Sequence, residues 1–139
     1  MDEAIKLAKK LKDKNALALA LNWAASLGCA ERNPAKVDRS ASDLIELSTR
    51  HNFMYFLALG AIWRGWARSV SGDTAEGISW IEQGIRDIRA SGTVLALPGY
   101  LARKAEALHL SRRLRWPVNF FEESYSPRRR KANRVEARR

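Results

Sequence analysis

The side chains that could catalyse a reaction or hold a metal are few and widely separated along the chain. The two histidines, His51 and His109, lie far apart in the sequence, and neither has acidic or cysteine neighbours at ligand spacing. Cys29 is the single cysteine and lies in an apolar stretch, which favours a small core residue over a nucleophile. The adjacent acids Glu122 and Glu123 point to different sides of a helix, and we expect them to be solvated. With no Ser/His/Asp set, we predict a non-enzyme with no catalytic residue, metal site or cofactor.

Tryptophan and arginine side chains offer a different chemistry, the binding of a partner. Trp63 and Trp66 are three residues apart and therefore share a helix face. Arg64 and Arg68 are one turn apart, where they could hold an acidic peptide by charge-assisted hydrogen bonds. We predict a candidate partner groove at Trp63, Arg64 and Arg68. Two alternatives stay open, namely tryptophans packed in the core and arginines along a solvated edge.

A second candidate site is the basic C-terminal segment. Residues 112–139 hold ten Lys or Arg and three acids, against fifteen and twelve in residues 1–111, so most of the net charge of +10 belongs to this tail. Aromatic residues in the tail precede a basic run, which is Arg128, Arg129, Arg130 and Lys131. Basic clusters beside aromatic residues bind nucleic acid through phosphates and stacking. The alternative prediction for the chain is therefore a small basic nucleic-acid-binding protein acting through its tail.

Composition limits the fold and the compartment. A chain of 139 residues with 46% apolar content is enough for one domain with a core. Four prolines and an absence of strand-like Val, Ile and Thr runs predict an all-α protein. No apolar run approaches the roughly 20 residues of a membrane span, and the N-terminal stretch lacks the apolar region of a secretory signal. These features predict a cytoplasmic protein with no membrane span.

Apolar periodicity divides the chain into helices. The predicted helices cover residues 3–13, 16–31, 34–51, 53–71, 74–90 and 95–111. Asn15 is the predicted N-cap of the second helix, and Asn52 is the predicted left-handed residue at the end of the third. The tight turn after the fourth helix contains Gly72, which can adopt the left-handed conformation, and Asp73, which can cap the next helix.

The first of these helices has lysines opposite an apolar face that includes Leu7 and Leu11. A Lys-rich amphipathic helix can lie on an acidic membrane surface. The other interpretation is a packed first helix with a solvated face.

Glycines inside two of the predicted helices indicate close packing. Gly65, Gly77 and Gly84 lie within helical periodicity, where glycine costs about 1 kcal/mol relative to alanine. Close approach of two helix backbones would offset that cost. We therefore predict a tight hairpin of helices 53–71 and 74–90. The predicted helix-packing small positions are Ala25, Gly65, Gly72, Gly77, Gly84 and Ala105.

Residue types recur at a constant interval along the chain. Ala25, Gly65 and Ala105 are all small and evenly spaced. In each unit, a helix that is apolar on several sides precedes a helix with one apolar stripe. Helix pairs with a period of about 40 residues predict an α-solenoid of antiparallel hairpins. Residues 1–111 would hold about two and a half such repeats, and residues 112–139 are predicted to form an extended or disordered basic tail.

The glycines of the central hairpin carry a family resemblance. Gly65, Gly72, Gly77 and Gly84, with Ile81 as the large apolar residue between the last two, resemble the tetratricopeptide repeat. The period is longer than is usual for that repeat, which leaves HEAT-like hairpins open.

A closer resemblance covers roughly Asn15 to Leu110. The run GAIWRGWARSVSGDTAEGISWIEQGIRDIRASG, followed by LPGYLARKAEALHL, resembles the C-terminal repeat region of large bacterial signalling proteins. Those proteins join a class III adenylate/guanylate cyclase domain, or a related output domain, to an AAA-type ATPase module and then tetratricopeptide-like repeats. This chain has neither the cyclase metal-binding aspartates nor a GxxxxGK[ST] phosphate loop, so neither activity carries over.

The resemblance implies a protein–protein interaction or scaffolding module, either the repeat region or a truncated remnant of such a protein. Its partner would be another protein, a peptide or other domains of a longer parent chain, docked on the concave face of the solenoid. The resemblance does not specify an oligomeric state.

Overall fold

The computed structural model describes the backbone of residues 1–124 and the side chains of residues 1–112. Its helices are α1 (Asp2–Lys10), α2 (Lys14–Ala30), α3 (Pro34–His51), α4 (Met54–Val70), α5 (Thr74–Ala90) and α6 (Leu97–Ser124). Residues 1–124 contain no strand, which confirms the predicted all-α class. None of the described helices combines the length and the apolar content needed to cross a membrane.

The turns that end successive helices are evenly spaced along the chain. Positive φ angles occur at Lys12 (56°), Arg32 (57°), Asn52 (58°), Gly72 (108°) and Gly92 (76°). At the first four turns, the amide of the next residue donates to the carbonyl five residues before it, at 2.9 to 3.1 Å. This is the Schellman bond that satisfies a free carbonyl at a helix end. Two helices with their turns therefore span the interval of about 40 residues at which small residues recur in the sequence.

The helix ends agree with the sequence at Asn52 and Gly72 and differ at Asn15 and Asp73. Asn52 adopts the predicted left-handed conformation. Asn15 is not the N-cap of α2, because Asp13 occupies that position and accepts a hydrogen bond from the Ala16 amide at 3.0 Å. Asp73 stands at the N-cap of α5 without a side-chain capping bond, and its carboxylate faces Arg68 instead.

Helix α6 is longer than the sequence predicts. It continues as one helix through Pro117 to Ser124, whereas an extended tail is expected from residue 112. Residues 112–124 are helical and not extended; the prediction rested on the loss of apolar periodicity and on the prolines at 117 and 127. Leucine and arginine, which recur at the start of this stretch, favour helix whether or not one face is apolar. The remainder of the basic tail, with Arg128, Arg129, Arg130 and Lys131, lies outside the described residues.

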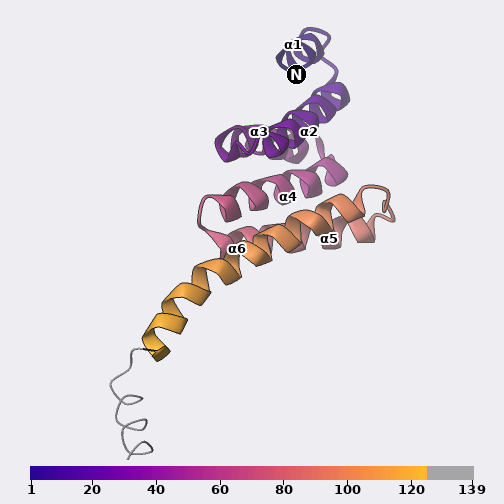
Figure 1. Cartoon of the computed structure of the whole chain (residues 1–139). Coiled ribbons are helices and arrows are strands. Elements are labelled where there is room, and N and C mark those ends of the chain that lie inside the picture. The colour runs from indigo at the N-terminus through magenta and orange to yellow at the C-terminus, as the bar shows by residue number, and fades with distance from the viewer. Residues whose placement is uncertain (125–139) are drawn as a thin grey trace, which may run out of the picture.

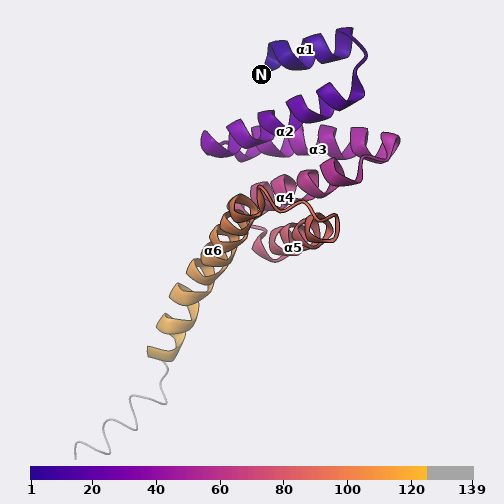
Figure 2. The same cartoon turned by 90° about the vertical axis from the view of Figure 1, so that its right-hand side faces the viewer.

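The helices are stacked in chain order, with α1 at one end and α6 projecting from the other (Figures 1 and 2). Helix α4 lies at the centre and contacts α2, α3, α5 and α6. Its residue Trp63 contacts α2 and α6, whereas the next residue, Arg64, contacts α3 and α5. We call these two faces of α4 the even-helix side and the odd-helix side.

Helices α4 and α5 meet backbone to backbone. A Cβ atom added to Gly65 would lie 2.5 Å from the carbonyl oxygen of Gly77, and one added to Gly84 would lie 2.6 Å from that of Ala58. Real Cβ atoms essentially never make contacts that short, so only glycine fits at these positions without a shift of the backbone. The three glycines predicted to bring the hairpin together therefore lie in its interface.

The other predicted packing positions have different environments. Ala25 is fully buried in the core. Gly72 is exposed in the turn, with a φ of 108° and no atom within 4 Å of an added Cβ, so it serves the turn and not the packing. Ala105 is exposed, because no described helix covers its face of α6 in the way that α5 covers Gly65.

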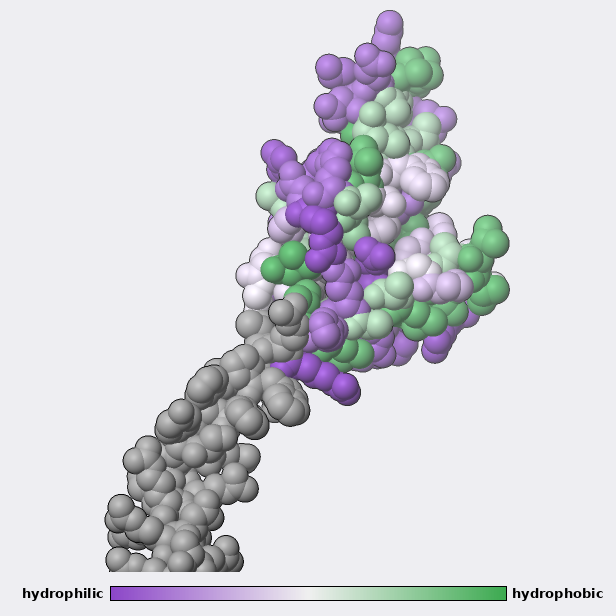
Figure 3. Space-filling model, viewed as in Figure 1, coloured by the Kyte–Doolittle hydropathy of each residue, from purple (hydrophilic) through white to green (hydrophobic). Residues whose placement is uncertain are grey.

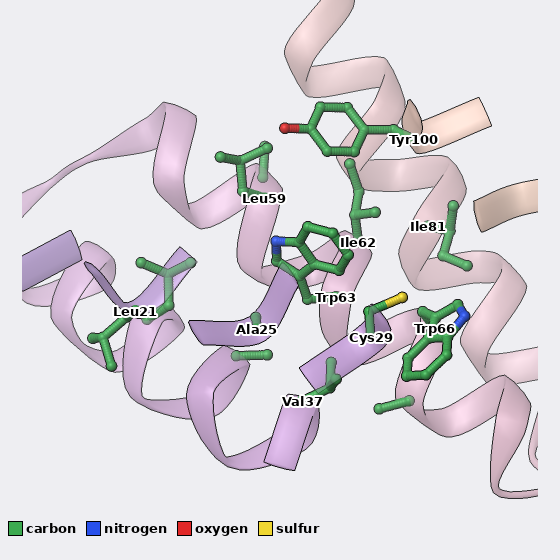
Figure 4. Packing of buried hydrophobic residues seen from close by; sticks show 14 of the residues in the cluster. Leu21, Ala25, Cys29, Val37, Leu59, Ile62, Trp63, Trp66, Ile81 and Tyr100 are labelled. Carbon is green, nitrogen blue, oxygen red and sulfur yellow. The ribbon is translucent and has the colours of Figure 1, made fainter. Parts of the chain in front are cut away.

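The core runs through all three even-numbered helices and the helices packed against them (Figure 4). Its largest fully buried side chains include Trp66, Leu44, Leu59, Ile62, Ile81 and Ile88. The last two belong to the isoleucine stripe of α5, which faces α4 as the spacing of these residues requires.

Candidate partner-binding groove

Trp63 is a core residue on the even-helix side of α4. Its Nε1 donates a hydrogen bond to Asn22 Oδ1 at 2.8 Å, and its ring packs edge-on against Tyr100 with centroids 6.3 Å apart. The side chain is only 7% exposed. Trp63 therefore joins α2, α4 and α6 and offers little surface to a partner (Figure 4).

Trp66 belongs to a polar cluster that closes the same side of the molecule. Its Nε1 donates to Glu106 Oε2 at 2.9 Å, and the same carboxylate accepts a hydrogen bond from Arg32. The Arg32 guanidinium lies 5.5 Å from the centroid of the Trp66 ring. Arg103 lies 3.8 Å from Glu106 and donates to Cys29 Sγ at 2.9 Å. These five residues tie together α2, α4 and α6.

The protonation states of this cluster fit a structural role. Burial pushes the pKa of Glu106 upward, but hydrogen bonds from Arg32 and Trp66 and the nearby arginine charges outweigh it, so the pKa falls below its ordinary value. Burial raises the pKa of Cys29 despite the hydrogen bond and charge of Arg103. Cys29 is therefore a neutral thiol, which is a poor nucleophile.

Arg64 lies on the odd-helix side, facing α3 and α5. Its Nε atom is 3.8 Å from Asp38 Oδ1, which is an ion pair and not a hydrogen bond. Its Cζ atom lies 5.0 Å from the centroid of the Trp80 ring, in cation–π geometry. Arg64 therefore holds one face of the Trp80 indole.

Arg68 is occupied by the turn that follows its own helix. Its guanidinium lies 3.9 Å from the carboxylate of Asp73 and 3.6 Å from that of Glu76. The residues predicted to form a groove are thus separated, with Trp63 on the even-helix side and Arg64 and Arg68 paired with acids elsewhere. Neighbouring helical residues point about 100° apart, which puts Trp63 and Arg64 against different helices.

An open groove of about 450 Å³ lies between α3, α4 and α5. Its apolar lining residues are Ile45, Leu57, Ala61 and Trp80. Its polar lining residues are Ser79, Gln83 and Asp87. The three polar residues are spaced by four along α5 and so form one edge of the groove. Gln83 Nε2 donates to Asp87 Oδ1 at 3.0 Å, which orders this edge.

Small residues of α4 shape the floor of the groove. A Cβ atom on Gly60 would lie 2.7 Å from Cγ1 of Ile45, so glycine lets α3 come close at this point. Ala61, the next residue, lines the groove with a single methyl group and leaves the space above it open. We call the hollow lined by Ile45, Leu57, Ala61 and Trp80 the Trp80 groove.

Trp80 is a candidate site residue that was not predicted from the sequence. One available signal is its position on α5, because it stands beside and not within the buried stripe formed by Ile81, Ile85 and Ile88. A large aromatic residue placed off the apolar stripe of a helix is expected at a secondary contact or a binding surface.

No protein-family model, curated protein or solved structure matches this chain. Within the described residues, no three His, Cys, Asp or Glu side chains gather in a group that could hold a metal ion. The Trp80 groove is therefore identified by its geometry and by the chemistry of its lining.

Proposed function

We propose that this chain is a tetratricopeptide-like α-solenoid module that binds a protein or peptide segment in the Trp80 groove. The even spacing of the left-handed turns supports the repeat architecture, since helix-pair repeats place equivalent turns at a constant interval. The proposed role is docking without enzymatic activity.

The observation that carries this proposal is the combination of an aromatic wall, an apolar floor and a polar edge in one groove. Trp80 is held from one side by Arg64, while Leu57 and Ala61 lie on the floor. Buried aromatic anchors surrounded by a polar rim are typical of the residues that dominate binding energy in protein interfaces. The groove is thus suited to a bulky apolar side chain from a partner.

The charges around the groove indicate which flanking residues the partner should carry. Arg64 and Arg68 already face Asp38, Asp73 and Glu76, so they are not expected to attract an acidic peptide. Asp87 is an exposed carboxylate on the polar edge. The proposed ligand is therefore a segment with a bulky apolar residue next to a lysine or arginine.

The proposed setting is the cytoplasm of a bacterium, in a signalling protein of the cyclase/ATPase type or in a truncated remnant of one. The support is the sequence resemblance over roughly Asn15 to Leu110. The coding DNA tests this setting: a repeat-like continuation in one of its reading frames would support a longer parent gene, and its absence from every frame would contradict it.

Selection of a random peptide library on the immobilised full chain tests the binding proposal. Enriched peptides are expected to share a bulky apolar residue beside a basic one. Ala61→Arg fills the floor of the groove and is expected to weaken binding about tenfold or more, since it blocks the anchor pocket. Leu95→Arg is the matched control, because Leu95 is 94% exposed in the turn before α6.

The selection would contradict the proposal if no peptide were enriched, or if the enriched peptides bound Ala61→Arg as tightly as the unchanged chain. Circular dichroism of both variants checks that the helices are retained.

A further inference from the structure

The α1–α2 end of the molecule exposes a concentrated set of large apolar side chains. They are Met1, Leu7, Leu11, Leu19, Trp23 and Leu27. Leu11 is 67% exposed and Trp23 is 55% exposed, so the contacts within the chain leave most of both side chains in solvent. Figure 3 shows hydrophobic residues on one side of this end and hydrophilic residues on the other.

A groove of about 290 Å³ runs between the two helices. Leu7 lines it from α1, Leu11 lines it from the C-cap of α1, and Leu19 and Trp23 line it from α2. We call it the α1–α2 groove. Helices α1 and α2 lie at the opposite end of the stack from α6 (Figure 1). The α1–α2 groove shares no lining residue with the Trp80 groove.

Charge on α1 is acidic in the first turn and basic from Lys6 onward. Asp2 and Glu3 stand in the first turn, and Lys9 and Lys10 stand in the last turn. Glu3 and Lys10 are two helical turns apart, so they project within about 20° of each other along one edge of the helix. Both are exposed, and Leu7 lies between them along the axis.

We infer that a second copy of this chain occupies the α1–α2 groove, with the two α1 helices antiparallel about a two-fold axis. In an antiparallel pair with this symmetry, one edge of a helix faces the same edge of its partner. Glu3 of each copy then faces Lys10 of the other, which makes the edge complementary to itself. Leu7 and Leu11 of each copy fill the groove beside Leu19 and Trp23 of the other.

The same charges argue against an anionic membrane as the occupant. A lipid surface of that kind favours a polar face rich in lysine and arginine. Here Asp2, Glu3 and Asp13 accompany the lysines at the start of the chain, and Glu3 neighbours Ala4 of the groove lining. Acidic and basic residues at opposite ends of one short helix suit an antiparallel copy.

Sedimentation velocity of the full chain over a range of concentrations tests the inference. A reversible monomer–dimer equilibrium is expected, and Leu11→Asp is expected to shift it to monomer because it places a charge in the apolar seam. Leu95→Asp is the matched control and should leave the dimer intact, since Leu95 is equally apolar and 94% exposed outside the groove. A chain that is monomeric throughout the range, or a Leu11→Asp variant that still dimerises, would overturn the inference.

Charge reversal tests the antiparallel arrangement. Glu3→Lys and Lys10→Glu are each expected to raise the dimer dissociation constant about tenfold, because two symmetry-related pairs change from attraction to repulsion. When the two variants are mixed, every facing pair is again opposite in charge, so a heterodimer should form with the original affinity. A mixture that associates as weakly as either variant alone would contradict the arrangement.

Both substitutions are at exposed positions, so the fold should be retained, which circular dichroism checks. Sedimentation with vesicles of anionic lipid tests whether a membrane, and not a second copy, occupies the α1–α2 groove. Vesicle binding that is lost in Leu11→Asp, together with a monomeric free chain, would overturn the inference and assign the groove to a membrane. The peptide selection described for the Trp80 groove is independent of all these outcomes.

Discussion

The α4–α5 pair and the α1–α2 pair are joined by the same kind of turn, yet they are packed very differently. Each pair is connected by a left-handed residue and a Schellman bond, at Gly72 and at Lys12. Helix α5 buries five of its residues, whereas α1 buries only Ala8. The turn therefore fixes where a helix reverses, and the side chains on the facing surfaces decide how closely the two helices approach.

The physical difference lies in the residues at the two interfaces. Gly65, Gly77 and Gly84 let the backbones of α4 and α5 touch, and the isoleucines of α5 fill the space beside them. Alanines and leucines face each other across α1 and α2, and the leucines Leu7, Leu11 and Leu19 stay largely exposed. One pair is therefore tightly packed at the centre of the molecule, and the other leaves apolar surface exposed.

The largest expected effect on stability comes from adding a methyl group inside the α4–α5 interface. Gly65→Ala would place a Cβ atom 2.5 Å from the carbonyl oxygen of Gly77, so we expect it to lower the free energy of unfolding by about 3 kcal/mol. Urea unfolding followed by circular dichroism measures this loss.

Gly99→Ala is the matched control in α6, because an added Cβ there meets no atom within 4 Å. We expect no loss, and a gain of up to about 1 kcal/mol from the better helix propensity of alanine. Equal effects of the two substitutions would show that close backbone contact does not stabilise the α4–α5 pair.

A smaller effect on stability is expected when a buried tryptophan and an exposed tryptophan are each replaced by phenylalanine. Trp66→Phe removes the hydrogen bond to Glu106 and leaves a void in a fully buried site, which should cost about 2 kcal/mol. Trp23→Phe should change the stability of the dilute, monomeric chain by less than about 0.5 kcal/mol, since its side chain is 55% exposed. Similar losses for both variants would contradict the contrast between the two regions.

The smallest expected effect is a change in the pH dependence of stability. The pKa of Glu106 is lowered in the folded chain, so its ionised form stabilises the fold above the ordinary glutamate pKa of about 4.3. This contribution is lost as the pH falls through the lowered value. Glu106→Gln should therefore be less stable than the unchanged chain at pH 7, and the difference should shrink as the solution is acidified.

Urea midpoints measured from neutral pH down to about pH 3 test this prediction. A difference that stays constant over the whole range would mean that the charge of Glu106 does not contribute to folding.

Much of the backbone could be predicted from the sequence, because it follows from local signals. Helix periodicity placed the elements, Asn52 marked a left-handed helix end, and glycines inside α4 and α5 marked a close approach. Lys12 and Arg32 also adopt left-handed conformations, although neither residue type favours them. Only their spacing from Asn52 and Gly72 could have revealed those turns.

The candidate site was harder to predict because it depends on which neighbours surround each helix. Trp63 and Arg64 are adjacent in sequence, but α4 is covered on both sides, so one faces α2 and α6 and the other faces α3 and α5. The sequence does not show which neighbour lies on which side. Trp80 is a candidate site residue because Arg64 packs against its ring and because the short side chain of Ala61 leaves the groove beside it open.

Hydrogen–deuterium exchange of the dilute, monomeric full chain tests the contrast between the two helix pairs most directly. Amides in the middle of α4 and α5 should exchange most slowly, through global unfolding, because both helices are buried against each other. Amides of α1 should exchange faster by about tenfold or more, since α2 is the one described helix that α1 contacts closely and α1 buries one residue. Protection of α1 equal to that of α5 would contradict the account, because the α1–α2 end would then be as firmly packed as the glycine-rich centre.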